Sequence, residues 1–385
     1  MSVDESQSAQ PGGVSISICR DAAAFAALQP EWDDRVERAP AHSGTPVFAF
    51  NLQAVRQLGR DAGQLRLIVA RDGGRLAGLW PLALRREYGV TIARQLGSGS
   101  LQEYASPLIS PDAPPALAAA MLQAAEGLAD VLEVWNLPVA SPLVRLLDAQ
   151  RRAKVPRTGD CPTISLREAG SWEAWIARRS RSFRQGLGNS RRRLEKLGAV
   201  AFREIEAADA ADFAQWMVRT KRRWLDERAI RRSWLRDEAC ATFYSNLIGI
   251  PGSGVTGFAL TLDGRIICGG ICLLAASRLE YFVTAFDTTY AAFSPGGLWL
   301  EECVRWCIPR RLDFDFRMMQ FAYKLRWADR MDRYEGYSIA CTPAGLLEIG
   351  RMKLLPLLSA ARARVRPVRQ WLRRQKRRRL SAAAA

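Results

Sequence analysis

Apolar residues in this chain fall into short runs separated by turn signals, and three such runs follow one another in each half. The runs are residues 65–70, 75–84 and 90–96 in the first half, and 255–262, 265–275 and 278–286 in the second. Asp-Gly between alternating apolar runs is a strong hairpin signal, and it occurs at Asp72-Gly73 and at Asp263-Gly264. Each set of three runs therefore predicts an antiparallel meander.

The elements around the two meanders also recur in one order: a strand, two helices, the three strands, a helix and a strand. The flanking elements expected in the first half are 14–19, 22–36, 48–60, 113–129 and 131–137, and those in the second are 200–205, 209–227, 237–249, a helix from Ser294 and 312–316. A repeat of this length is a duplicated domain. We therefore predict an α/β (α+β) fold of two tandem units with mixed, largely antiparallel sheets.

The same pattern divides the chain into a leader, two units joined by a helix, and a tail. The expected segments are a disordered leader at 1–13, a first unit at 14–168, a basic linker helix at 169–198, a second unit at 199–345 and a basic amphipathic tail at 346–385. With 385 residues, of which 48% are hydrophobic and 25% charged, the chain is long enough for two cores of ordinary globular composition.

The formal charge of +17 is concentrated in two segments. Residues 351–385 contain twelve Lys or Arg and no acid, and residues 178–196 contain eight Lys or Arg and one Glu. The rest of the chain is close to neutral. The basic character therefore belongs to these two segments and not to the predicted domains.

The basic tail also carries apolar side chains, including Trp371 and a leucine cluster from Leu354 to Leu358. This composition favours an anionic membrane surface over residues 351–380, although nucleic acid attracts the same charge. The start of the chain lacks the pattern of a signal peptide, no apolar run reaches membrane-spanning length, and eight scattered cysteines predict reduced thiols. We expect a cytoplasmic protein held peripherally at the inner face of the membrane; its oligomeric state is not predicted.

Histidine and cysteine patterns favour plain structural roles. The one histidine, His42, lies in a loop-like stretch without a nucleophile motif. Two C-x3-C pairs, Cys268 with Cys272 and Cys303 with Cys307, have a spacing that zinc sites use. Residues four apart share one face of a strand or of a helix, so core packing explains both pairs and we predict no metal.

A glycine-rich helix start follows the second meander. Pro295 suits a first helical position, Ser294 is an expected side-chain cap, and Gly296 and Gly297 leave the backbone open to close approach. The amides and the positive dipole end of such a helix favour a phosphate group. The equivalent stretch of the first half, residues 104–116, offers no glycine, so only the second unit is expected to hold a ligand there.

The ordered set Tyr281, Asp287, Tyr290, Ser294-Pro295-Gly296, Asp313-Phe314-Asp315 and Tyr323-Lys324-x-x-Trp327 resembles the CelD-type acetyltransferases found with bacterial exopolysaccharide genes. These are GNAT acyltransferases related to the FemABX peptidyltransferases. The resemblance covers roughly residues 15–340 and implies tandem GNAT-like units with acyl-CoA as co-substrate, its pyrophosphate at the Ser294 helix start. One departure is Arg317-Met318-Met319, which replaces a glycine-containing turn after the strand 312–316.

Candidate site residues follow from this pattern. Asp287 and Asp315 each follow or end a predicted central strand, where a catalytic base must reach the nucleophile. Tyr323 and Lys324 are predicted to orient the acceptor, as donor and as point charge. Ser294, Gly296 and Gly297 are the predicted cofactor-binding residues, and Tyr281, Arg184 and Arg191 the predicted substrate-binding residues.

We therefore predict an acyltransferase that moves an acyl group, most simply acetyl, from acyl-CoA to an amine or hydroxyl of a sugar, an exopolysaccharide or a lipid-linked envelope precursor. Two alternatives stay open. One is a FemABX-like transferase that uses aminoacyl-tRNA, with the basic linker helix holding RNA. The other is a non-catalytic scaffold for exopolysaccharide synthesis, held at the membrane by its tail.

Overall fold

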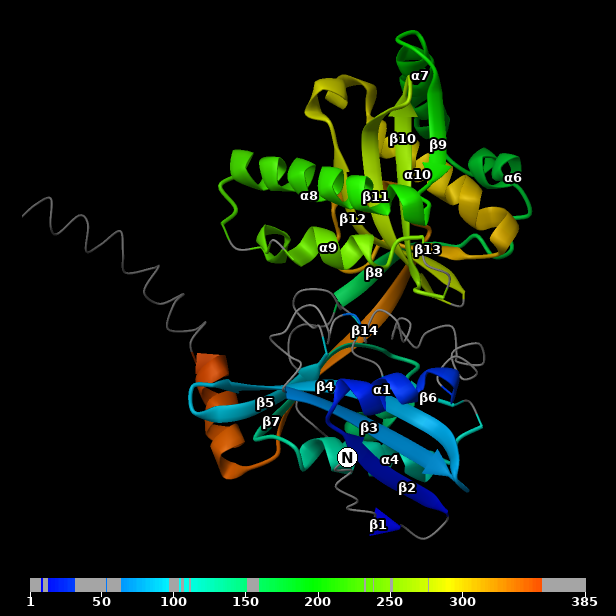
Figure 1. The fold of residues 1–385 in the computed structure, drawn as a ribbon. Coiled ribbons are helices and arrows are strands. Elements are labelled where there is room, and N and C mark those ends of the chain that lie inside the picture. Colours follow the sequence, from blue (N-terminus) through cyan, green and yellow to red (C-terminus); the bar gives the residue numbers. More distant parts are fainter. Residues whose placement is uncertain are drawn as a thin grey trace, which may run out of the picture.

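One sheet runs through the whole protein (Figure 1). The computed structural model describes residues 8–9, 13–31, 53, 64–96, 104, 107–110, 112–150, 159–231, 233–237, 239–249, 252–275 and 277–354. The strands lie in the order β1-β2-β3-β4-β5-β7-β14-β8-β13-β12-β11-β10-β9, with β6 beside β4. The predicted helix 48–60 apart from residue 53, His42 and the tail beyond residue 354 lie outside the described residues.

The first half of the sheet contains the first predicted meander. Its strands are β1 (Ser8–Ala9), β2 (Val14–Cys19), β3 (Leu65–Asp72), β4 (Arg75–Glu87), β5 (Val90–Gln95), β6 (Leu108–Ile109) and β7 (Val131–Pro138). All of these pairings are antiparallel except that of β5 with β7. The helices are α1 (Ala22–Ala27), α4 (Pro115–Glu126) and α5 (Pro142–Ala149). Helices α4 and α5 pack Leu117, Met121 and Leu143 against the sheet in one apolar core.

The second half repeats this arrangement. Its strands are β9 (Val200–Glu204), β10 (Val255–Leu262), β11 (Arg265–Ala275), β12 (Arg278–Phe286) and β13 (Asp313–Asp315). Here, too, neighbours are antiparallel except for the last pair, β12 with β13. A helix stands between the two parallel strands in each half, α4 in the first and α10 (Pro295–Cys307) in the second. The matching topology confirms the predicted duplication and the mixed, largely antiparallel sheet.

The two halves exchange their last strands. Strand β8 (Gly159–Ile164), from the first half of the chain, pairs with β13, and β14 (Arg330–Ala340), from the second half, pairs with β7. The two exchanged strands also pair with each other, and they join the halves in the middle of Figure 1. The expected ranges 14–168 and 199–345 therefore describe order along the chain, whereas each half of the sheet contains a strand from the other range.

Helices cover both faces of the second half (Figure 1). On one face α8 (Ala210–Glu227) and α9 (Ala239–Ser245) pack against β10, β11 and β12. On the other face lie α10 together with α6 (Trp172–Ala177), α7 (Arg181–Glu195) and α11 (Ala322–Trp327). The segment expected as one linker helix thus contains two helices, and Ser180 caps the second by accepting a hydrogen bond from the Phe183 amide at 3.2 Å.

The remaining short elements connect these layers. They are the 3-10 helices η2 (Ala207–Asp209), η3 (Trp234–Arg236), η4 (Thr288–Phe293) and η5 (Ile308–Arg310), and a final helical segment at 343–354. No helix within the described residues is both long enough and apolar enough to cross a bilayer.

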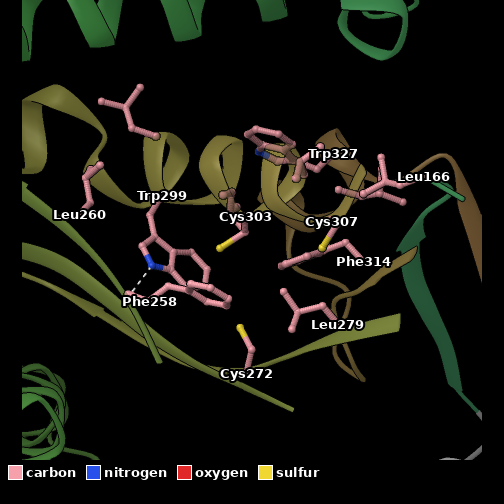
Figure 2. Packing of buried hydrophobic residues seen from close by; sticks show 14 of the residues in the cluster. Leu166, Phe258, Leu260, Cys272, Leu279, Trp299, Cys303, Cys307, Phe314 and Trp327 are labelled. Carbon is pink, nitrogen blue, oxygen red and sulfur yellow. Dashed lines mark hydrogen bonds between the residues drawn. The ribbon is translucent and has the colours of Figure 1, made fainter. Parts of the chain in front are cut away.

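The paired cysteines of the second half lie in its core. Cys268 and Cys272 on β11 and Cys303 and Cys307 on α10 are all fully buried. Figure 2 shows Cys303 and Cys307 on the inner side of the helix, with Cys272 below them and Trp299 beside them. Burial raises the pKa of Cys268, Cys303 and Cys307, so these side chains stay as thiols. The structure thus places all four where small apolar side chains pack, as their spacing predicts.

Candidate active site

Strand β13 ends while β12 continues, and a cavity lies beside the part of β12 that extends past β13. Pairing between them covers only Arg278–Glu280 and Asp313–Asp315. Beyond this point β12 continues to Phe286 without β13 beside it, and its pairing with β11 contains a bulge. The cavity has a volume of about 550 Å³ and is lined by residues of α8, β12, α10 and α11. Because β13 ends there, side chains from both faces of the sheet reach the same space.

The start of α10 forms one wall of this cavity. Ser294, Gly296 and Gly297 all line it, as do Trp299 and Leu300 one turn later. A Cβ atom placed on Gly296 would meet nothing within 4 Å, so the space beside this backbone is open to a ligand. Ser294 is the N-cap residue of α10, as predicted, but its backbone is left-handed with φ of 53° and its side chain makes no capping bond. Its hydroxyl is therefore not committed to the helix.

Three hydroxyl groups form a chain along another wall. Tyr323 Oη donates to Tyr281 Oη at 3.2 Å, and Tyr281 Oη lies 2.5 Å from Thr284 Oγ1. Tyr323 is 42% exposed, whereas Tyr281 is largely covered. Burial raises the pKa of both phenols, which keeps them protonated and able to donate. The predicted residues Tyr281 and Tyr323 therefore belong to one connected group in the cavity.

Helix α8 contributes Lys221, which the sequence analysis did not select. Lys221 Nζ donates to the Thr284 carbonyl at 3.1 Å and lies 4.3 Å from the centre of the Trp224 ring. Its position follows Ala214, Met217 and Val218 on the buried face of α8, at the helical spacing that leads to Leu225. The sequence could have indicated Lys221, because it is a lysine on the apolar face of an amphipathic helix. It was missed because Arg222 and Arg223 follow it and make the stretch look like a solvent-exposed basic run.

Lys324 is buried outside the lining of the cavity. Its Nζ donates to the carbonyl oxygens of Phe316 at 2.7 Å and Met318 at 2.9 Å. These carbonyls belong to the turn that follows β13, in which Arg317 and Met319 have positive φ angles of 57° and 76°. Lys324 thus stabilises a turn that has no glycine, and it lies 5.6 Å from the Tyr281 ring.

Asp315 ends β13 in a fully buried polar network at the junction of the two halves. Its carboxylate accepts from Tyr104 Oη at 2.9 Å, from Cys161 Sγ at 2.8 Å and from the Arg317 amide at 2.6 Å, and it lies 3.3 Å from Arg278. Tyr104 and Cys161 come from the first half of the chain. Asp315 therefore contacts both halves and does not line the cavity.

Glu280 belongs to the same buried network and pairs with Arg278 at 3.1 Å. Burial raises the pKa of Glu280 to about 7, although Arg278 opposes this increase. Arg278 itself contacts both acids, and Arg317 faces Glu280 at 3.9 Å, so two guanidinium groups face the two carboxyl groups.

Asp287 follows β12 at the edge of a second, charged cavity of about 510 Å³. Its side chain accepts from the Thr289 amide at 3.0 Å and faces Arg265 at 3.7 Å. Partial burial favours a higher pKa, but the hydrogen bonds from Thr289 and the charge of Arg265 outweigh it, so the pKa of Asp287 is lowered. Asp287 is thus at the end of the central strand, as predicted, but it does not line the cavity beside α10.

The two predicted substrate-binding arginines tie helices together. Arg184 donates to the carbonyls of Ala177 and Arg179, both at 2.9 Å. Arg191 pairs with Glu301 at 3.2 Å and with Glu302, both on α10. Of the predicted site residues, the structure brings together Tyr281, Ser294, Gly296, Gly297 and Tyr323. It places the others outside the cavity: Asp287, Asp315, Lys324, Arg184 and Arg191.

Comparison with known proteins gives the class to which this glycine-led helix and its meander belong. Residues 181–325 match the acetyltransferase (GNAT) domain, the region that contains α7, the second meander, α10 and α11. These residues therefore form a GNAT acetyltransferase domain, and the protein is an acyltransferase by class. No curated protein matches the chain at a significant level.

Solved structures resemble most of the chain in fold. FemX is 11% identical with a TM-score of 0.58, and the match covers 80% of this chain and 95% of FemX. The C-terminal domain of a proposed lysylphosphatidylglycerol synthetase from Agrobacterium fabrum is 13% identical with a TM-score of 0.54, covering 86% and 97%. A protein of unknown function from Bacteroides thetaiotaomicron is 11% identical with a TM-score of 0.54, covering 81% and 96%. At these identities the likeness concerns the fold alone.

Proposed function

We propose that the protein transfers an acyl group from acyl-CoA to an amine or hydroxyl of a sugar or lipid-linked envelope precursor, as the resemblance to CelD-type acetyltransferases implies. The observation that carries this proposal is the cavity lined by α8, β12, α10 and α11, which combines open backbone at Gly296 with a connected set of hydroxyl groups. Tandem GNAT units, acetyl-CoA and an exopolysaccharide context belong to the same proposal.

The donor fits the α10 side of the cavity. The positive end of the α10 dipole and the space beside Gly296 suit a pyrophosphate, which needs close approach to the backbone. Trp299, Leu300 and Phe286 supply an apolar wall for the uncharged arm that carries the thioester. Beyond Glu280, no strand among the described residues lies on the side of β12 that faced β13, so the β12 backbone there is available to the thioester oxygen.

The acceptor attacks the thioester carbon directly. A C–N or C–O bond forms, the C–S bond breaks, and the leaving thiolate takes a proton from Tyr323. The Tyr323 phenolate then regains a proton from solvent, to which it is 42% exposed, and its hydroxyl chain continues to Tyr281 and Thr284. Asp287 is our candidate for the final acceptor of the nucleophile's proton, because it is partly exposed and directly follows the cavity residue Phe286. Lys324 acts by holding the turn before α11, which carries Tyr323.

Purified protein incubated with acetyl-CoA and longer acyl-CoA esters tests the proposal. We expect saturable binding, seen as quenching of the tryptophans that line the cavity, and acceptor-dependent release of free CoA when amino sugars are added. Absence of both binding and CoA release would overturn the proposal. Transfer from aminoacyl-tRNA in the same assay would instead support the FemABX-like alternative, for which the exposed basic face of α7, including Arg192 and Arg193, is the feature to test.

A further inference from the structure

The transfer cavity contains one charged side chain among its described lining residues, and that residue is Lys221. The other lining groups are aromatic, aliphatic, glycine or hydroxyl residues. Helix α8, which carries Lys221, covers the face of the sheet opposite to α10. Lys221 therefore enters the cavity from the side away from the glycine-led helix start.

Within the described part of the chain, Lys221 has no carboxylate partner. Its side chain is half-buried, and among the described residues its ammonium contacts the Thr284 carbonyl and the Trp224 ring. Arg228 contacts the same ring at 4.3 Å, so a second cation lies close to the first. Burial, and then the charge of Arg228, lower the pKa of Lys221. A partly desolvated cation without a counter-ion is unfavourable, and an anion that enters the cavity relieves this cost.

The anion could come from the donor or from the acceptor, and these two are expected on opposite faces of the sheet. Phosphate groups of the donor belong at the start of α10, where the backbone beside Gly296 is open. Lys221 is anchored to the far edge of the opening through Thr284, beside Trp224 and Thr220 of its own helix. An anionic group that reaches Lys221 from the α8 side therefore belongs to the acceptor.

We propose that Lys221 is a specificity-determining residue that binds a carboxylate or phosphate group on the acyl acceptor. This inference rests on the proposed acyl transfer, because it assigns the α8 side of the same cavity to the acceptor. A negatively charged sugar fits this side better than its neutral counterpart, since charge-assisted hydrogen bonds are strongest where water is partly excluded. The Trp224 ring beside Lys221 offers a flat apolar surface for the body of a sugar.

The experiment measures binding of glucosamine 6-phosphate and of glucosamine by calorimetry, with the full protein saturated by CoA. Four proteins are compared: wild type, Lys221→Met, Lys221→Arg and Lys353→Met. Lys353 is an exposed lysine on the helical segment 343–354, outside the cavity, so its variant controls for the loss of one positive charge. CoA affinity itself is measured first for each protein.

We expect the wild type and Lys353→Met to bind the phosphorylated sugar about tenfold or more tightly than the neutral one. Lys221→Met should lose this preference with unchanged CoA affinity, and Lys221→Arg should keep most of it because a cation remains. A wild type without preference for the charged sugar, or a preference that survives in Lys221→Met, would overturn the inference. So would failure of arginine to restore it, which would indicate a neutral-amine base instead.

A fall in CoA affinity in Lys221→Met would assign the lysine to the donor phosphates and also overturn the inference. Failure of the proposed function has a different signature: no protein in the series, wild type included, would then bind CoA. The two failures are therefore separated by the first measurement.

Discussion

The two halves of the sheet have the same topology but differ at one point, the parallel strand pair that flanks the central helix. In the first half β5 pairs with β7 over Ile92–Arg94 and ends at Gln95. In the second half β12 pairs with β13 over Arg278–Glu280 and then continues alone through Phe286. The extra length of β12 creates the opening. In the second half, the cavity therefore lies where one strand of the parallel pair is longer than the other.

The central helices differ in the same sense. Helix α4 begins after Pro114 with Pro115 and no glycine, whereas α10 begins with Pro295, Gly296 and Gly297. Both helices nevertheless pack on a strand glycine: a Cβ at Gly78 on β4 would crowd Met121 and Leu117, and one at Gly270 on β11 would overlap Trp299. Packing against the sheet is thus common to both units, while the backbone open to a ligand is found at the start of α10.

The largest expected effect comes from a charge placed at the second residue of each helix. Gly296→Glu places a negative side chain in the open space beside α10, so we expect loss of CoA binding by at least about 100-fold with the fold intact. Ala116→Glu changes the matching, exposed position of α4 and should leave CoA affinity unchanged. Fluorescence titration with CoA measures both. Equal affinity of the two variants would contradict the assignment of the cofactor to the second half.

The ion pairs beneath the two strand pairs provide the next comparison. Asp315→Asn leaves Arg278 buried with less negative charge, so we expect the free energy of unfolding to fall by about 3 kcal/mol. Glu133→Gln in the first half should cost less, because Arg94 keeps its pair with Glu87 at 2.7 Å. Urea denaturation followed by circular dichroism measures both values. A smaller loss of unfolding free energy for Asp315→Asn than for Glu133→Gln would show that the Arg278–Asp315 ion pair stabilises the protein less than the Arg94–Glu133 pair does.

Removal of one hydroxyl from the cavity should affect turnover more than binding. Tyr323→Phe keeps the ring but removes the donor to the leaving thiolate, so we expect kcat to fall by about tenfold to 100-fold with CoA affinity nearly unchanged. Tyr88→Phe, at an exposed turn of the first half, is the matched control and should retain full activity. Steady-state rates at saturating acyl-CoA measure kcat for both variants. Equal kcat values would mean that Tyr323 does not donate a proton in the reaction.

A smaller effect is expected from pH. The pKa of Glu280 is raised to about 7 in the folded protein from an ordinary value of 4.5, so the folded state binds more protons than the unfolded state between these values. The contribution of Glu280 to stability is therefore fully present below pH 4.5 and is lost as the pH rises through about 7. Thermal melts of Glu280→Gln should show a weaker decline over this range than wild type. Parallel curves would mean that Glu280 is ionised throughout.

The smallest effect on catalysis is expected from removal of the basic tail. A chain that ends at Leu354 keeps both halves of the sheet and should turn over acyl-CoA at the wild-type rate, whereas we propose that only the full chain sediments with vesicles rich in acidic lipid. Apolar burial should preserve part of this binding at high salt. Equal sedimentation of both proteins would argue against the membrane anchor, and salt-sensitive RNA binding by the tail would favour the tRNA-dependent alternative.

The sequence alone determined the local elements, the duplication and the helix start. Both meanders, the helix after Ser294 and the strand at 313–315 follow from periodicity and turn chemistry, which act over a few residues. For the same reason, Gly296 and Gly297 could be selected as candidate site residues before their positions in space were known, whereas Tyr281 and Tyr323 were selected from the resemblance to CelD-type acetyltransferases. Ser294 was placed at the correct helix boundary, but its side chain makes no cap there.

Only the tertiary structure decided how these elements combine. The exchange of β8 and β14 is a long-range pairing choice that leaves no local pattern, and it puts Asp315 in a buried junction with Tyr104 and Cys161 instead of in the cavity. The end of β13 beside β12 likewise depends on where two distant strands stop pairing. Because β13 ends there, Lys221 of α8 can line the same cavity as residues of α10 on the opposite face of the sheet. The spacing of residues along the chain cannot predict this contact, because the two helices are far apart in sequence.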